Sequence, residues 1–148
     1  MKIDKYSLKS DSSLTIFEFV SEGQNGLIRK LIQFQETNQI DIYNLAFGDK
    51  NVDTGEIDDL VVSNNGDADK VLATVVAALY AFLDKHPDAF VYATGSTKAR
   101  TRLYRIGITR FYKEMTKDFE LYGQIGDEFY EFEVGKEYAG FLAQRKFS

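Results

Sequence analysis

The spacing of apolar residues along the first sixty positions predicts a series of strands. Leu14, Ile16 and Val20 alternate with polar residues, although Phe17 and Phe19 make the second face partly apolar as well. Turn-forming residues fill 21–26 and 37–38, and 48–55 is a loop. The predicted strands cover 14–20, 27–35, 40–47 and 57–63. We expect the first three to form an antiparallel meander.

A nearly continuous apolar segment then predicts a buried helix over 68–85. Asp67 is the expected N-cap residue, because its side chain can accept from the first free N–H groups of a helix. The apolar residues between Val71 and Leu83 leave almost no polar face, which is typical of a helix packed inside a core. A short apolar strand over 89–94, suited to a sheet interior, follows Pro87.

A second helix, predicted over 98–117, has one apolar and one basic face. At roughly 100° per residue, the apolar face carries Ala99, Leu103, Ile106, Gly107, Phe111 and Met115. Lys98, Arg102 and Arg105 lie on the opposite, exposed face. Arg100 falls near the buried edge and Arg110 on the apolar face, so both are expected to need charged partners.

The last part of the chain predicts a hairpin over 119–125 and 129–134, turning at 126–127. The tail over 138–147 is compatible with either a helix or a strand. Together these elements predict an α+β fold in a single domain, 1–148. We expect an antiparallel-dominated sheet of about six to seven strands, with two main helices packed on one face.

Composition narrows the class of protein. The chain has 148 residues, is 44% hydrophobic and contains no cysteine. Disulfides, thiolate metal sites and thiol nucleophiles are therefore excluded, which fits a reducing cytoplasm. The N-terminus lacks the apolar core of a signal peptide, and the run over 71–83 is too short to span a bilayer. We expect a soluble cytoplasmic protein that does not associate with membranes.

Charge is divided unevenly along the chain. The net charge of −5 argues against broad, nonspecific binding of nucleic acid. An acidic segment over 49–69 nevertheless contrasts with a basic segment over 98–113. The acidic residues are Asp49, Asp53, Glu56, Asp58, Asp59, Asp67 and Asp69, and the basic ones are Lys98, Arg100, Arg102, Arg105, Arg110 and Lys113.

The strand-to-helix corner at 94–98, Thr-Gly-Ser-Thr-Lys, is the main candidate site. A helix start presents free backbone N–H groups and the positive end of the helix dipole, which together favour phosphate or carboxylate. The predicted anion-binding or nucleic-acid-binding residues are Ser96, Thr97, Lys98, Arg100, Arg102 and Arg105, with Asn64 and Asn65 from the preceding strand-to-helix corner. The alternative is a hydroxyl cap followed by a solvated basic face.

Other candidate chemistry is weaker. The segment over 49–55 resembles a calcium loop, but Thr54 stands where glycine is required, so a hairpin loop is favoured. Asp58 and Asp59 would point to opposite faces of a regular strand. His86 is the only histidine. We predict neither a metal nor a cofactor, and the sequence leaves open whether the protein is an enzyme.

Two stretches carry a family resemblance. The sequences GEIDDLVVSNNGDADKVLATV (55–75) and ATGSTKARTRLYR (93–105) resemble an uncharacterised family of small proteins common in Bacteroidetes, for which GSTxARTRLYR is a signature. The likeness extends over nearly the whole chain, including DFELYG at 118–123. The resemblance implies a bacterial, cytoplasmic, single-domain protein and supplies no catalytic residue.

Three functions follow as hypotheses. The first is a domain that binds a phosphate-containing ligand or RNA at the 95–105 corner. The second is a ribonuclease-like protein or another toxin–antitoxin component, using arginine and lysine to stabilise transition-state charge. The third is a non-catalytic interaction module, in which the basic helix docks on the acidic segment of a protein partner or of a second copy, giving a homo-oligomer.

Overall fold

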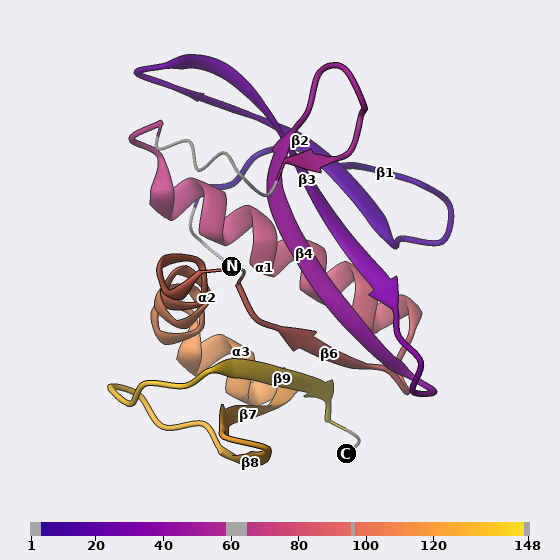
Figure 1. Ribbon diagram of the computed structural model, residues 1–148, viewed down its shortest axis with the longest axis vertical. Coiled ribbons are helices and arrows are strands. Elements are labelled where there is room, and N and C mark those ends of the chain that lie inside the picture. Colours follow the sequence, from indigo (N-terminus) through magenta and orange to yellow (C-terminus); the bar gives the residue numbers. More distant parts are fainter. Residues whose placement is uncertain (1–3, 59–64, 96, 147–148) are drawn as a thin grey trace. The chain divides into compact units, whose positions relative to one another are not determined.

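The computed structural model describes residues 4–58, 65–95 and 97–146, and it divides into two compact units (Figure 1). Unit 1 comprises Met1–Phe34 and Ala46–Lys85, and unit 2 comprises Gln35–Leu45 and His86–Ser148. Each unit is therefore built from two separate stretches of chain. The strand β4, Ile42–Lys50, contributes its first part to unit 2 and its remainder to unit 1.

The meander predicted for the N-terminal strands is confirmed in unit 1. The strands are β1 (Lys9–Ser10), β2 (Ile16–Gly23), β3 (Gly26–Glu36), β4 and β5 (Ile57–Asp58). β1 and β3 flank β2 in antiparallel pairing, β3 lies next to β4, and β5 pairs antiparallel with β4. Gly26 adopts a φ of 87° at the turn between β2 and β3, a conformation that favours glycine.

The core of unit 1 forms between this meander and α1, Ala68–Lys85, whose bounds match the prediction. The rings of Phe34 on β3 and Phe82 on α1 stack with centroids 4.3 Å apart. On β2, the buried apolar side chains are Phe17 and Phe19, whereas Ile16 and Val20 are exposed. Of the two partly apolar faces expected for this strand, the one with the two phenylalanines packs into the core, because the larger rings remove more apolar surface from water.

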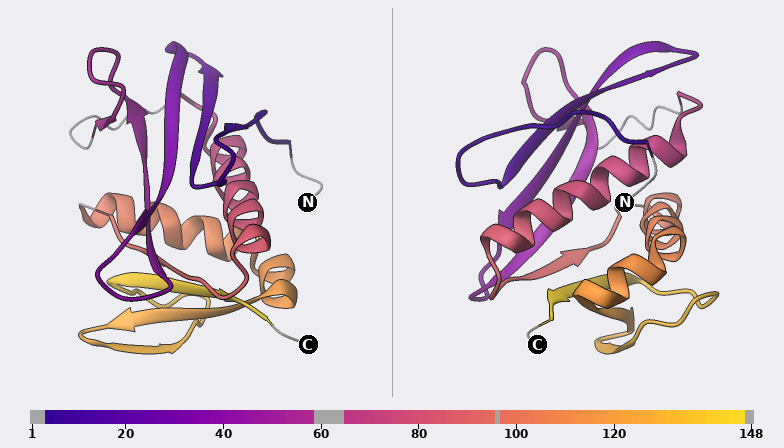
Figure 2. Two further views of the ribbon diagram at one scale, coloured as in Figure 1. Left: turned by 90° about the vertical axis from the view of Figure 1, so that its right-hand side faces the viewer. Right: turned by 180° about the vertical axis from the view of Figure 1, so that it is seen from behind.

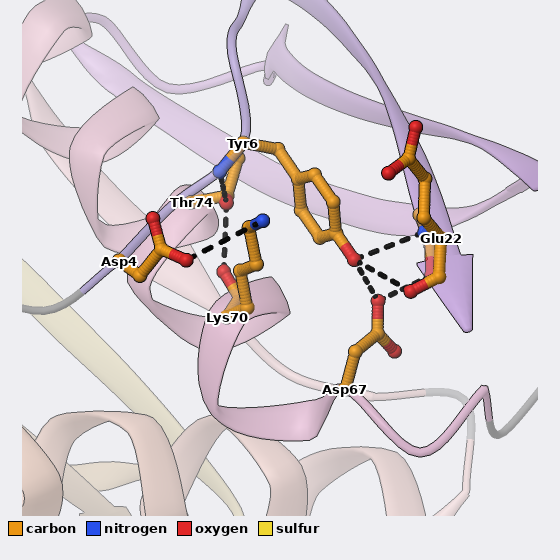
Figure 3. A network of polar contacts seen from close by, with 7 residues as sticks. Asp4, Tyr6, Glu22, Asp67, Lys70 and Thr74 are labelled. Carbon is orange, nitrogen blue, oxygen red and sulfur yellow. Dashed lines mark hydrogen bonds and ion pairs between the residues drawn. The ribbon is translucent and has the colours of Figure 1, made fainter.

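Tyr6 ties the N-terminal segment to β2 and α1 (Figure 3). Its backbone N–H donates to Oγ1 of Thr74 (2.9 Å), and its hydroxyl lies 2.5 Å from Oδ2 of Asp67. The same hydroxyl accepts from the backbone N–H of Glu22 (2.9 Å). Ser21 also donates to Asp67 (2.5 Å). Asp67 lies directly before α1 as predicted, and its carboxylate joins the helix start to these two hydroxyls.

A buried ion pair links β3 to β4 in unit 1. The ammonium of Lys30 bonds Oδ1 of Asp49, and both side chains are about nine-tenths buried or more. The Lys30 ammonium also lies 5.9 Å from the ring centre of Phe47. The loop over 51–56 that follows is the predicted hairpin loop, in which Oδ1 of Asn51 accepts from the N–H groups of Asp53 and Thr54.

Unit 2 is a second set of strands with helices on one side. β6 (Phe90–Ala93) runs parallel to the first part of β4 and antiparallel to β9 (Gly140–Arg145). β9 pairs with β7 (Phe119–Ile125), which forms a hairpin with β8 (Glu128–Glu131). The tail whose conformation the sequence left open is thus the central strand β9. Figure 2 shows α2 (Lys98–Arg110) and α3 (Tyr112–Asp118) on the same side of β7 and β9.

The fold class is α+β with a mostly antiparallel sheet, as predicted, but the number of elements differs. The described residues contain nine strands and three helices, against the expected six to seven strands and two helices. The helix predicted over 98–117 is interrupted at Phe111, whose φ and ψ of −105° and 18° lie outside the helical range. Of the strand predicted over 57–63, β5 covers 57–58, and 59–63 lie outside the described residues.

The buried face of α2 also differs from the prediction. Tyr104 and Gly107 are buried, whereas Ala99 and Arg110, both predicted to face the core, are exposed. The aromatic ring of Tyr104 therefore sets the rotation of the helix, since it buries more apolar area than an alanine methyl group. In the part of the chain that the structure describes, no helix is long and apolar enough to cross a membrane.

Candidate functional site

A tight corner in unit 2 connects β6 to α2. Thr97 is the N-cap of α2, and its Oγ1 accepts from the N–H of Arg100 (3.2 Å). The N–H of Gly95 donates to Oγ1 of Thr101 (3.0 Å). A Cβ at Gly95 would lie 2.5 Å from the backbone nitrogen of Thr101, so only glycine lets the strand end approach the helix this closely. The predicted cap is thereby confirmed, and the corner is held from both sides.

Three cations lie along one side of α2. Lys98, Arg102 and Arg105 are spaced at i, i+4 and i+7, which places them on the same helix face. Lys98 and Arg102 are exposed, and Arg105 is half-buried. Within the described residues, none of the three forms an ion pair. Their charges are therefore available to a ligand.

These cations line a pocket of about 610 Å³. Its walls come from three segments of unit 2: the end of β6, the exposed side of α2 and the loop before β9. The lining residues are Thr94, Gly95, Thr97, Lys98, Thr101, Arg102, Arg105, Glu137, Tyr138 and Ala139. This volume lies within the range of about 300–1,000 Å³ that is usual for small-molecule sites.

The wall opposite α2 is anchored by hydrogen bonds and by packing. Oγ1 of Thr94 donates to the carbonyl of Ala139 (2.8 Å), joining the end of β6 to this loop. The ring of Tyr138 is buried, with Phe132 at a centroid distance of 5.5 Å, and its hydroxyl accepts from the N–H of Glu133 (3.0 Å). A Cβ on Gly123 would overlap this ring at 2.3 Å. Both walls of the pocket are thus fixed by contacts within unit 2.

A second, smaller pocket of about 400 Å³ lies farther along α2. Arg105 lines both pockets, and Arg110 lines the second one. Its other walls come from Ile106, Thr109 and the loop at Val134 and Gly135. Along a helix that rises about 1.5 Å per residue, the positively lined surface from Lys98 to Arg110 extends about 18 Å.

Four of the sequence-predicted site residues, Thr97, Lys98, Arg102 and Arg105, are brought together in the larger pocket. Arg100 is half-buried on the other side of α2 and interacts with other residues of the structure. Ser96 and Asn64 lie outside the described residues. The predicted roles of these residues in ligand binding remain predictions.

Asn65 belongs to unit 1, where its side chain is buried and hydrogen-bonded. Its Nδ2 donates to Oγ of Ser21 (3.1 Å) and to the carbonyl of Gly26 (2.9 Å), and its Oδ1 accepts from the N–H of Asn25 (2.6 Å). These bonds hold the β2–β3 turn.

The predicted binding residues left out six that line the larger pocket: Thr94, Gly95, Thr101, Glu137, Tyr138 and Ala139. Thr101 could have been found from helix periodicity, since it lies one turn after Thr97. Glu137 and Tyr138 carry no such signal, because their loop reaches the pocket only through the pairing of β9 with β6. Among the described residues, no cluster of three or more His, Cys, Asp or Glu could hold a metal ion.

Comparison with known proteins identifies a family and no activity. No curated protein and no solved structure matches the chain. A family model described as a family of unknown function (DUF6934) matches residues 2–146. The match covers nearly all of the 148 residues, including both stretches on which the family resemblance was based. The chain therefore belongs to DUF6934, a family of unknown function.

Proposed function

We propose that unit 2 binds a phosphate-containing ligand in the pocket between α2 and the loop before β9. One observation carries this proposal: Lys98, Arg102 and Arg105 line a single pocket without forming an ion pair among the described residues. Three cations on one helix repel one another, and an anion placed between them would relieve that repulsion.

The chemistry of the lining suits a phosphate group. Arginine offers a planar fork of N–H donors that matches phosphate oxygens, and a phosphate near Lys98 would also lie at the positive end of the α2 dipole. The hydroxyl of Thr97 accepts the capping bond and keeps its own proton for donation. Since the walls are held by hydrogen bonds, little ordering is required on binding.

Binding can be tested by titrating the protein with inorganic phosphate, with a nucleoside monophosphate and with a short single-stranded RNA at low salt. We expect Arg102→Ala/Arg105→Ala to weaken binding by about tenfold or more, because each arginine supplies charge-assisted hydrogen bonds. Lys113→Ala/Lys117→Ala is the matched control, since it removes two exposed charges from α3 that do not line the pocket. If the wild type binds none of the three ligands, the proposal is wrong.

The RNA titration also addresses the other functions predicted from the sequence. An RNA that occupies both pockets would bind more tightly than a mononucleotide and weaken steeply with added salt. Cleavage of that RNA, lost in the double variant, would be the result expected of a ribonuclease. For the interaction module, the structure reduces the available acidic surface, because Asp49 and Asp67 bond other residues of unit 1.

A further inference from the structure

Glu137 places a negative charge in the otherwise positively charged pocket. It lines the same cavity as Lys98, Arg102 and Arg105, and it is exposed on the loop before β9. Within the described residues it forms no ion pair with any of these cations. On the same loop, by contrast, Glu133 does pair with a cation, since Lys136 lies 3.5 Å from it.

A carboxylate at this position does not suit a pocket that binds a simple anion. Its charge repels phosphate and lowers the affinity that the three cations provide. A carboxylate can only accept hydrogen bonds when ionised, so it suits a ligand group that donates them. The pocket is therefore positive along α2 and acidic at the facing loop.

We propose that Glu137 is a specificity-determining residue that accepts hydrogen bonds from amino or hydroxyl groups of the ligand. This inference rests on the proposed function and narrows it. The ligand carries a phosphate at the end that lies against α2 and hydrogen-bond donors at the end that lies against Glu137. A nucleoside monophosphate has this arrangement, since its ribose hydroxyls and base amino groups lie away from the phosphate.

The size of the pocket agrees with such a ligand. A cavity of about 610 Å³ leaves most of its volume empty around a lone phosphate. The lining also includes the ring-bearing Tyr138, next to Glu137, and Gly95, which has no side chain to fill the pocket. These suit the flat body of a nucleobase or sugar between two polar ends.

The test compares Glu137→Gln with the wild type in calorimetric titrations against inorganic phosphate, ribose 5-phosphate and guanosine 5′-monophosphate. The variant keeps the size of the side chain and removes its charge. We expect phosphate to bind more tightly, because repulsion is lost, and the nucleotide to bind about tenfold more weakly, because charge-assisted hydrogen bonds are lost. Glu131→Gln, an exposed residue of β8 outside the pocket, is the control and should change neither affinity.

The opposite signs make the inference refutable. If Glu137→Gln tightens both phosphate and the nucleotide, or changes neither, Glu137 does not recognise donors, although the proposed function stands. If the wild type binds none of the three probes, the proposed function itself fails. The titration with ribose 5-phosphate shows which groups of the nucleotide donate to Glu137. If Glu137→Gln weakens binding of ribose 5-phosphate as much as binding of the nucleotide, the donors are the sugar hydroxyls. If it weakens binding of ribose 5-phosphate less, the donors are on the base.

Discussion

Replacing Tyr6 with phenylalanine should destabilise unit 1 by removing a single oxygen atom. The ring packs against Phe19 with centroids 5.6 Å apart, and phenylalanine keeps this packing. The hydroxyl, however, joins three segments of the unit, since it contacts Asp67, the carbonyl of Glu22 (3.1 Å) and the N–H of Glu22. Tyr6→Phe therefore isolates the contribution of these hydrogen bonds.

The expected loss of stability depends on which partners of the Tyr6 hydroxyl keep another hydrogen bond in the variant. Asp67 retains its bond from Ser21, so its carboxylate is not left without a donor. The N–H of Glu22 loses its bond to the Tyr6 oxygen, and a charge-assisted bond to Asp67 is lost as well. Hydrogen bonds to charged groups contribute about 1.5–3 kcal/mol, so we expect a loss of about 2 kcal/mol in the free energy of unfolding.

Urea unfolding followed by circular dichroism measures this loss, since the chain has no tryptophan to report on unfolding. If the two units unfold separately, only the transition of unit 1 should shift. Tyr130→Phe is the matched control, because its hydroxyl also bonds a carboxylate, that of Glu128 (2.6 Å), but at an exposed position on β8. The control should leave the urea midpoint unchanged.

The pH dependence provides a second measurement. Burial and the hydrogen bond to Asp67 raise the pKa of Tyr6 above its ordinary value of 10.0. The folded state thus holds this proton more strongly than the unfolded state, so the stabilisation is present below pH 10 and is lost as the pH rises further. Wild type should lose stability more steeply above pH 10 than Tyr6→Phe. Equal midpoints for wild type and Tyr6→Phe at neutral pH would refute the reasoning.

Three further substitutions test other parts of the fold. Lys30→Met leaves Asp49 buried without its cation and should lower the free energy of unfolding in urea by about 3–5 kcal/mol. Its control is Lys50→Met, which breaks a partly exposed ion pair with Glu18 (3.3 Å) and should lower that free energy by about 0–1 kcal/mol. Gly95→Ala places a Cβ 2.3 Å from Cβ of Arg100 and should destabilise unit 2 by about 1–3 kcal/mol, with line broadening or shifts of the Thr97–Thr101 amide signals in NMR spectra. Asp11→Asn should make the free energy of unfolding depend less on pH in acid. The Ser13 hydroxyl and backbone N–H groups lower the pKa of Asp11 from 3.8 to about 2. The stabilisation by Asp11 is therefore present above pH 3.8 and is lost as the pH falls toward 2. Unfolding midpoints measured between pH 2 and 5 check this, and parallel curves for variant and wild type would contradict it.

Local patterns predicted most of the elements correctly. The bounds of α1, the first meander and the β7–β8 hairpin at Gly126 all follow from periodicity and turn residues acting over short distances. The rotation of α2 about its own axis, which decides its buried face, could not be predicted from these local patterns. Its small and medium apolar residues lie on more than one side, and the burial of Tyr104 decides between them only in the folded unit.

The sequence predicted one wall of the candidate pocket, the cationic face of α2, and not the loop that faces it. The cation spacing on α2 is a local property, so Lys98, Arg102 and Arg105 could be placed on one face from the sequence. The facing wall depends on β9, whose segment had no clear preference for helix or strand. Because β9 pairs with residues of β6 that lie 48–54 positions earlier and with residues of β7 that lie 16–26 positions earlier, Glu137 could not be assigned to the pocket before the fold was known.

The division of unit 2 into two stretches affects the order in which the protein can fold during synthesis. Residues 42–45 of β4 pair in parallel with β6 at 90–93. A ribosome that adds about 5–20 residues per second needs roughly 2–10 s to make the intervening chain. For that time the early half of β4 exposes unpaired backbone groups, while unit 1, complete at residue 85, already has its partners. Nascent chains stalled just before β6 should therefore recruit chaperones more strongly than chains stalled after β9.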